Sequence, residues 1–398
     1  MLLSVALIVL MALLLGKILK TIHIPPILGM LLTGILLGPF VFDLIDDRIL
    51  SLSSELRQMA LIVILLRAGL ALKLEDLKKI GRPALLMSFI PATFELIGVL
   101  ILGPLLLGLS FLEAAILGSI LAAVSPAVVV PRMLHLMQSG YGKKKHIPEL
   151  ILSGASLDDI YVIILFSSFL QSYLTGSISF NLFYQLPLSI LFGVGLGLLI
   201  GLLSVVFFKR FHMRDTMKVL ILFSLSFLLI TLEVTLKPWL SISGLLSVMV
   251  LGGMIHHMYP ELAKRLVGKF EKIWVIAEIM LFVLVGAAVN ITVVSDLGIQ
   301  AIFLVFGALV FRTIGVFVAL LKTDLIMKER LFVMIAYLPK ATVQAAIGAI
   351  PLASGIPSGD LMLSVAVLAI IITAPLGAIG IDLTYSRLLP QENWVIFK

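Results

Sequence analysis

Two adjacent carboxylates, Asp158 and Asp159, stand in the middle of an apolar stretch that runs from residue 147 to residue 174. On a helix, Asp158 lies ~17 Å from the start of this stretch, which is near the midplane of a bilayer. An ionised side chain at that depth costs about 2.5–3.5 kcal/mol, so it marks a functional site by default. One structural acid could be tolerated there, but two neighbouring acids are hard to explain without function. The pair therefore predicts a binding site for a proton or a cation inside the membrane.

Two other polar residues, Ser125 and Lys340, lie about half-way along two further apolar stretches and so reach the same depth. A lysine near the midplane needs a counter-charge, and an aspartate is the obvious one. Because successive residues of a helix point about 100° apart, Asp158 and Asp159 cannot both face one cavity. We therefore expect one aspartate to meet Lys340 and the other to bind a transported cation.

Neutral oxygens near the two aspartates could complete a shell for a hard cation. The candidate hydroxyls belong to Ser125, Ser156 and Thr342. Pro126 removes a backbone donor in the middle of its stretch and frees backbone carbonyls, which a cation such as sodium can also use. These oxygens and the two aspartates form the predicted cation site.

A third acid at membrane depth, Glu95, also needs a basic partner. Arg312 lies in another apolar stretch at a similar depth. Since an unpaired buried charge is strongly destabilising, we expect these two residues to form a buried ion pair. A structural clamp is the role we favour over direct ion handling.

The elements that must position these residues are membrane helices. Hydrophobic residues make up 61% of the 398 residues and charged residues 13%, a composition that a soluble core does not take. The apolar runs last about 18 to 26 residues, which spans a bilayer as a helix, whereas the strands of a membrane barrel alternate over about 10 residues. The absence of cysteine excludes disulfides and thiol chemistry. We expect an all-α polytopic membrane protein with about thirteen transmembrane helices, at 2–19, 25–42, 55–72, 83–108, 112–137, 147–174, 186–208, 217–236, 239–258, 273–291, 298–321, 330–354 and 361–383.

Lysine and arginine residues gather in alternate links between these stretches, while the other links carry acids such as Asp43, Asp46 and Asp47. Because cytoplasmic links carry the excess of basic residues, the N-terminus is expected outside and the C-terminus in the cytoplasm of a multi-pass protein of the cell membrane. This arrangement also explains the net charge of +7. A nucleic-acid partner is therefore not needed.

Two stretches carry helix-breaking residues at mid-depth: Pro126 interrupts 112–137 and Pro339 interrupts 330–354. The two stretches are the fifth and the twelfth spans, and because one number is odd and the other even, they run in opposite directions through the bilayer. Paired interruptions in two halves are typical of an inverted repeat with an ion site at its interface. We expect the first six spans to repeat as the last six, with 186–208 as the linker helix between them.

At these residues the chain resembles the monovalent cation:proton antiporter superfamily, in its double-aspartate branch, and is similar to NHA-type and NapA-type sodium/proton exchangers. The resemblance rests on SPAVVVP at 125–131, GYG at 140–142, SLDDI at 156–160, LPKATVQAAIG at 338–348 and ITAPLG at 372–377. These segments cover both halves of the expected transport core. The resemblance implies an NhaA-like fold, in which two broken helices cross within an inverted-topology repeat.

The resemblance assigns a role to each charged candidate. It implies that Asp159 binds the cation or the proton, that Asp158 pairs with Lys340, and that Glu95 and Arg312 form an ion pair. The expected function is secondary active sodium or lithium/proton antiport, with Na⁺ and H⁺ competing for the midplane aspartate. No resident cofactor is implied, and the expected partners are the lipid bilayer and a monovalent cation.

The resemblance also implies a homodimer whose parts move against each other to give alternating access. The ion-transport core is expected at 83–175 and 298–385, and the scaffold and dimerisation domain at 1–82 and 215–292. Such an exchanger serves pH homeostasis.

Other classes of protein place aspartates in membranes. An intramembrane aspartyl protease needs its two aspartates on different helices, and here they are neighbours, so we expect no enzyme. A gated cation channel builds its filter from a ring of residues around an open pore. A paired lysine buried at membrane depth does not fit such a filter, so a channel is disfavoured. Potassium/proton antiport and sodium-coupled solute symport stay open as alternatives.

Overall fold

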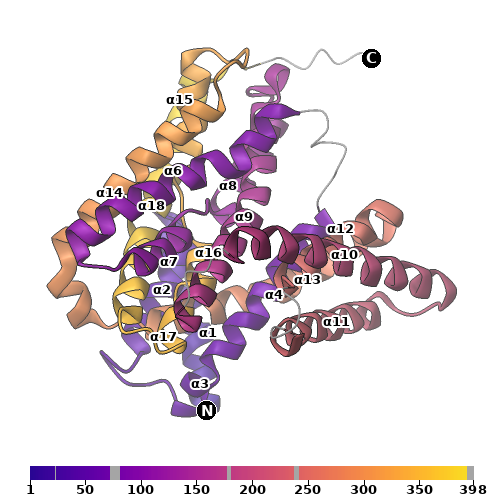
Figure 1. The fold of residues 1–398 in the computed structure, drawn as a ribbon, viewed down its shortest axis with the longest axis horizontal. Helices are drawn as coiled ribbons and strands as arrows, with labels where there is room; N and C mark the ends of the chain where they lie inside the picture. The colour runs from indigo at the N-terminus through magenta and orange to yellow at the C-terminus, as the bar shows by residue number, and fades with distance from the viewer. Residues whose placement is uncertain (23, 72–80, 177–180, 237–241, 392–398) are drawn as a thin grey trace. The chain divides into compact units, whose positions relative to one another are not determined.

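The structure is a computed structural model, and it describes residues 1–22, 24–71, 81–176, 181–236 and 242–391 (Figure 1). These described residues form helices and no strand, apart from a single antiparallel bridge between Tyr141 and Gln391. Two compact units divide the chain. The first unit comprises residues 1–54, 76–169 and 282–398, and the second comprises residues 55–75 and 170–281.

The first unit contains the helices that carry the predicted site. They are α1 (Leu2–Thr21), α2 (Pro26–Leu37), α3 (Asp47–Ser51), α6 (Arg82–Leu107), α7 (Phe111–Leu121), α8 (Pro126–Ser139), most of α9 (Ile147–Thr175), α14 (Ile291–Ala319), α15 (Met327–Ala336), α16 (Thr342–Ile347), α17 (Ile350–Ala353) and α18 (Gly359–Leu388). The second unit is built from α4 (Ser53–Ala71), α10 (Asn181–Arg210), α11 (Asp215–Leu236), α12 (Gly244–Met258) and most of α13 (Pro260–Ala287).

Seven of the described helical segments are long and apolar enough to cross a membrane. They are Leu2–Thr21, Arg82–Leu107, Phe111–Ser139, Leu191–Arg210, Asp215–Glu233, Gly298–Ala319 and Gly359–Leu388. Four shorter apolar helices accompany them, at Pro26–Leu37, Tyr161–Thr175, Gly244–Met258 and Thr342–Ala353. The all-helical membrane architecture is thus confirmed, while the count of thirteen spans stays a prediction.

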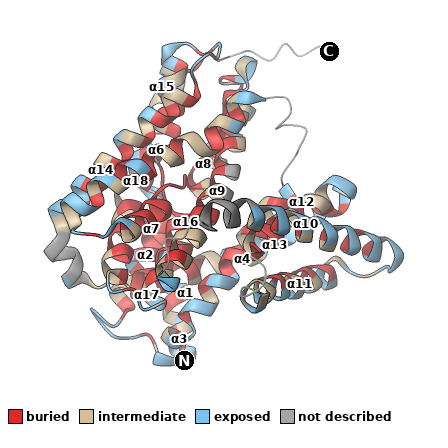
Figure 2. Ribbon diagram, in the orientation of Figure 1, coloured by how far each residue is buried: buried red, intermediate tan, exposed pale blue. Residues whose placement is uncertain are grey.

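The helices α7 and α16 lie inside the first unit (Figure 2). Every residue of α16 is buried, and so is every residue of α7 from Ala114 to Leu121. A helical segment that is buried on every side is typical of the centre of a bundle. Both helices are short because each is one half of an interrupted span.

The helices α6 and α14 pack unusually close together. A Cβ atom on Gly315 of α14 would lie 2.8 Å from the Cα of Pro91 in α6, and a Cβ atom on Gly98 would lie 2.7 Å from the ring of Phe311. Small residues of this kind allow two membrane helices to approach with their backbones nearly in contact. This approach brings the middle of α6, which carries Glu95, against the middle of α14.

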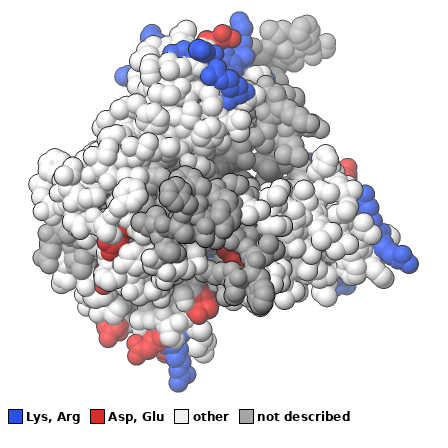
Figure 3. Space-filling model, viewed as in Figure 1, with Lys and Arg blue, Asp and Glu red and all other residues white. Residues whose placement is uncertain are grey.

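Charged side chains of the first unit separate toward its two ends. In Figure 3 mostly basic side chains gather near α15, together with an acidic group, and mostly acidic side chains lie near α3 at the opposite end, with basic ones beside them; the surface between is mostly uncharged. This is the distribution that the alternating links predict for a protein whose two ends meet different sides of a bilayer.

Candidate ion-binding site

Two interrupted helices meet inside the first unit. Residues 122–125 separate α7 from α8, which begins at Pro126, because the proline ring suits the first position of a helix but has no N–H to continue the previous one. Residues 337–341 separate α15 from α16, and here the proline, Pro339, lies within the break. The backbone N–H of Ser125 donates to the carbonyl of Pro339 across 2.8 Å. Both predicted interruptions are therefore present, and they are in contact.

The carbonyls freed by the first break are taken up by buried side chains. The carbonyls of Leu121, Ala122 and Ala123 accept hydrogen bonds from Lys340, Arg312 and Gln344, respectively. The Lys340 contact is 2.5 Å long and the Gln344 contact 2.9 Å. Each of these carbonyl oxygens keeps a second lone pair, so their part in the cation shell stays a prediction. Helix-end carbonyls buried away from water need donors, and in this structure the protein supplies them.

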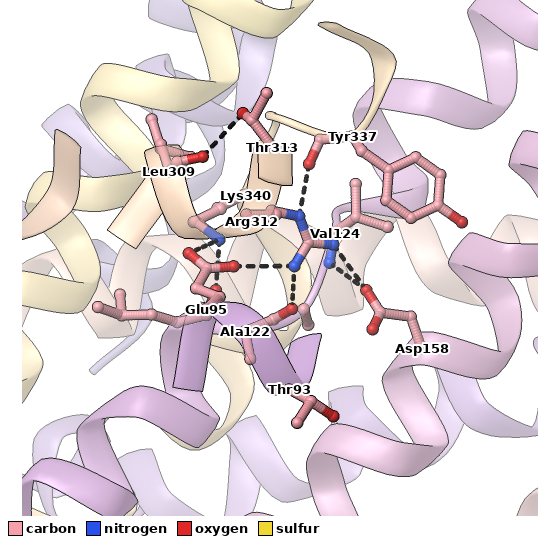
Figure 4. Close-up of polar contacts among 12 residues, drawn as sticks. Thr93, Glu95, Ala122, Val124, Asp158, Leu309, Arg312, Thr313, Tyr337 and Lys340 are labelled. Atoms are coloured by element: carbon pink, nitrogen blue, oxygen red, sulfur yellow. Dashed lines mark hydrogen bonds and ion pairs between the residues drawn. The ribbon is translucent and has the colours of Figure 1, made fainter. Parts of the chain in front are cut away.

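Four buried charges form one connected network (Figure 4). Arg312 lies 2.8 Å from Glu95 through one terminal nitrogen and 2.8 Å from Asp158 through the other. The ammonium of Lys340 lies 2.6 Å from the second oxygen of Glu95. None of these four side chains is more than 1% exposed. Two positive charges therefore compensate two negative charges, and the network as a whole is neutral.

The pairing within this network differs in part from the prediction. Glu95 and Arg312 are brought together as expected, but the expected ion pair between Asp158 and Lys340 is wrong. Asp158 pairs with Arg312, and Lys340 pairs with Glu95. The physical reason is that a guanidinium has five donors in a planar fork and can serve two carboxylates at once, as an ammonium on a flexible stem cannot do as well.

Hydrogen bonds to the backbone also hold Arg312 and Asp158 in place. Arg312 donates from Nε to the carbonyl of Tyr337 at 2.7 Å, which joins α14 to the second break. The Asp158 oxygen that contacts Arg312 also accepts the backbone N–H of Val124 at 3.0 Å, which joins α9 to the first break. The network is therefore anchored at both interruptions.

The two aspartates differ in their exposure and in their partners. Asp158 is fully buried, whereas Asp159 is half-buried. Among the described residues Asp158 has an ion-pair partner in Arg312, and Asp159 has none. Asp159 is thus the aspartate of the two without a counter-charge in the described part of the chain.

Oxygens of the predicted cation shell lack hydrogen-bond partners in the described part of the chain. They are Ser125 Oγ, Thr342 Oγ1 and one carboxylate oxygen each of Asp158 and Asp159. A buried acceptor left unsatisfied costs about 1–3 kcal/mol, unless a ligand or water completes it. Carboxylate and hydroxyl oxygens beside broken helices are what a transported hard cation needs. The side chain of Ser156, the remaining candidate, lies outside the described residues.

Two residues that the sequence did not single out contribute to the site. Gln344 donates to the carbonyls at the first break, and the hydroxyl of Thr373 on α18 accepts the backbone N–H of Lys340 at 2.9 Å. Gln344 lies in the segment LPKATVQAAIG at 338–348, which was the available signal. Thr373 lies in the segment ITAPLG at 372–377, but its residue type did not reveal its role, because threonines in membrane helices can bond their own backbone.

Comparison with known proteins identifies the same family over nearly the whole chain. The family model described as "Sodium/hydrogen exchanger, transmembrane" matches residues 5–385. The mouse protein named sodium/hydrogen exchanger 9B2 is 34% identical over 388 residues, a match that covers 93% of this chain and 69% of the mouse protein. The human sodium/hydrogen exchanger 9B1 is 31% identical over 403 residues, which covers 95% of this chain and 76% of the human protein.

A solved structure has the same fold. The sodium proton antiporter MjNhaP1 from Methanocaldococcus jannaschii superposes with a TM-score of 0.83, covering 96% of this chain and 97% of that one, at 20% sequence identity. This structural likeness shows the fold, and the family model and the relatives show the family. This chain therefore belongs to the sodium/hydrogen exchanger family, within the monovalent cation:proton antiporter superfamily.

Proposed function

We propose that the protein exchanges sodium or lithium ions for protons across a membrane, and that the two substrates compete for Asp159. The observation that carries the proposal is the contrast between this half-buried acid, which has no ion-pair partner among the described residues, and the neutral network of four buried charges beside it. A carboxylate in that position needs one positive charge before it can be carried through the bilayer. A proton or a monovalent cation supplies that charge.

The relatives favour sodium as the cation, because the mouse and human proteins are named sodium/hydrogen exchangers. Ser125 and Thr342 offer neutral oxygens beside the breaks, which suits a cation that must shed part of its water shell. Asp158 contributes to the same site while Arg312 holds one of its oxygens. Potassium is tested as an alternative substrate in the experiment below.

Alternating access is the proposed route. Competition alone moves nothing; the substrate must bind with different affinity to the inward and outward arrangements of the protein. We take residues 83–175 and 298–385 as the part that carries the site across the membrane, 1–82 and 215–292 as the scaffold, and 186–208 as the linker helix. We also propose a homodimer in the cell membrane with its N-terminus outside and its C-terminus in the cytoplasm, acting in pH homeostasis.

The test is reconstitution of the purified protein in liposomes that contain a pH-sensitive dye. Inward gradients of Na⁺, Li⁺ and K⁺ are applied in turn, and sodium or lithium is expected to drive proton movement. Asp159→Asn is expected to lower this exchange to the level of empty liposomes. Asp382→Asn is the matched control, because Asp382 is a half-exposed aspartate that pairs with Arg132 away from the site.

Three results would overturn the proposal. Exchange that survives in Asp159→Asn would remove the central assignment. Proton movement driven by K⁺ alone would make the protein a potassium exchanger. Sodium uptake that needs an organic solute and moves no protons would make it a symporter.

A further inference from the structure

The backbone of the second break is held by three hydrogen bonds from other helices. Arg312 donates to the carbonyl of Tyr337, Ser125 donates to the carbonyl of Pro339, and the N–H of Lys340 donates to the hydroxyl of Thr373. Thr373 is fully buried. Lys340 is therefore fixed at two points, at its backbone by Thr373 and at its ammonium by Glu95 and the Leu121 carbonyl.

The bond to Thr373 has a counterpart at the first break. There the N–H of Val124 donates to Asp158, which lies 34 residues further along the chain. At the second break the N–H of Lys340 donates to Thr373, which lies 33 residues further along. In both cases the donor directly precedes the residue that caps the second half-helix, Ser125 in one and Ala341 in the other. Thr373 thus accepts at the second break the backbone hydrogen bond that Asp158 accepts at the first.

Packing between α18 and the second break keeps this hydrogen bond short. Gly377 stands one helical turn after Thr373, on the same face of α18, and a Cβ atom there would overlap the ring of Pro339. Because Gly377 has no side chain, the residue before Lys340 can lie against the helix. The Lys340 N–H then reaches the Thr373 hydroxyl at 2.9 Å.

We propose that Thr373 is a positioning residue for cation binding, which acts by fixing the backbone of Lys340. With Lys340 in place, Glu95 has its own cation and Arg312 can reach Asp158 with its other terminal nitrogen. Without the Thr373 hydroxyl, the Lys340 backbone loses its acceptor, and the ammonium no longer reaches Glu95 and the Leu121 carbonyl together. Arg312 is then drawn toward Glu95 and away from Asp158. Asp158 and Ser125 at the first break are then no longer held in the positions that bind the cation. This inference rests on the proposed exchange function.

Its test is the apparent KM for sodium, measured with the maximal rate in liposomes at one fixed pH. Thr373→Val keeps the shape of the side chain and removes the acceptor. It is expected to raise the apparent KM about threefold to tenfold, as the loss of one buried hydrogen bond would, with a smaller change in maximal rate. Thr373→Ser retains the hydroxyl and is expected to restore the wild-type KM.

Ser364→Ala is the matched control for folding. Ser364 is a buried hydroxyl residue on the same helix, and its hydroxyl bonds only to the carbonyl of Asp360 one turn before it among the described contacts. It is expected to change the thermal unfolding temperature as much as Thr373→Val does and to leave the KM unchanged. If the wild type exchanges sodium for protons, either of two results would overturn the inference. One is an unchanged KM in Thr373→Val, and the other is a Thr373→Ser variant whose KM is raised as much as that of Thr373→Val. A wild type that moves no protons would overturn the proposed function and this inference with it.

Discussion

Arg312 holds Asp158 at 2.8 Å in a pair that is fully buried, and it does so from a helix that lies 154 residues further along the chain. An arginine keeps its positive charge at any physiological pH, so the first aspartate has a permanent counter-charge. Asp159 forms no ion pair with Arg312. This division of labour leaves Lys340 free to serve Glu95, and it makes the arginine the centre of the charged network.

The central place of Arg312 predicts a large loss of stability when it is removed. Arg312→Met would leave Glu95 with one cation, Asp158 with no ion-pair partner, and the carbonyls of Ala122 and Tyr337 with no donor from this side chain. Removing one partner of a buried ion pair costs about 3–5 kcal/mol. Thermal unfolding of the purified protein in detergent measures the loss. Arg312→Lys is not expected to restore stability, since an ammonium cannot replace the planar fork.

Arg132→Met is the control for that experiment. Arg132 pairs with Asp382 at 3.0 Å, but both side chains are partly exposed, and such pairs contribute at most about 1 kcal/mol. Equal losses of stability in the two variants would show that the buried network is no more important than a surface pair.

The corrected pairing predicts which residues are energetically coupled. In a double-mutant cycle on unfolding free energy, Glu95→Gln and Lys340→Gln should show a coupling of about 1–3 kcal/mol, because they remove the two ends of one buried pair. Asp158→Asn and Lys340→Gln should show a smaller coupling, since Asp158 pairs with Arg312 instead. The reverse order of the two couplings would restore the pairing that the sequence suggested.

The neutrality of the network predicts how exchange responds to voltage. If Glu95, Asp158, Arg312 and Lys340 cancel one another throughout, Asp159 carries one proton in one direction and one monovalent cation in the other. Each cycle then moves no net charge. The rate of sodium-driven proton movement in liposomes should therefore be the same at a clamped potential of zero and of about −100 mV, where each uncompensated charge would gain about 2.3 kcal/mol. A rate that changes several-fold with voltage would show that a member of the network also gives up its charge.

The close approach of α6 and α14 predicts a position where one methyl group is harmful. Gly315→Ala would place a Cβ atom 2.8 Å from the Cα of Pro91 and force the two helices apart. We expect a loss of about 1–3 kcal/mol of stability, the usual cost of overpacking, together with weaker exchange because Glu95 and Arg312 are separated. Gly298→Ala on the same helix is the matched control, since a Cβ atom there meets nothing within 4 Å. Similar effects of the two substitutions would mean that helix propensity rather than packing decides.

Much of the site could be predicted from the sequence because ionisable residues inside a membrane are rare and costly. Asp158, Asp159, Glu95, Arg312 and Lys340 all stood out for that reason. The two breaks could be predicted as well, since proline removes a backbone donor wherever it stands. The number of spans is less certain from sequence, because short apolar helices such as α12 and α16 do not reveal whether they cross alone.

The pair of Glu95 and Arg312 could be predicted, but the partners of Asp158 and Lys340 could not. Matching each acid to a base by depth alone treats every ion pair as separate, whereas one guanidinium serves two acids here. Depth also says nothing about which buried donors take up the carbonyls at a break. The roles of Gln344 and Thr373 were missed for that reason, because a neutral polar side chain in an apolar helix is usually satisfied locally.

The sequence distance between Arg312 and its two acids has a consequence for biosynthesis. Glu95 precedes its arginine by 217 residues and Asp158 by 154, so the ribosome releases both acids into the membrane well before their counter-charge exists. Until α14 is synthesised, the two acids need another way to avoid an unpaired charge in the membrane. They are either protonated or held within the insertion machinery. Maturation of the protein in the bilayer is then completed from its C-terminal half, when α14 arrives and neutralises what was inserted before it.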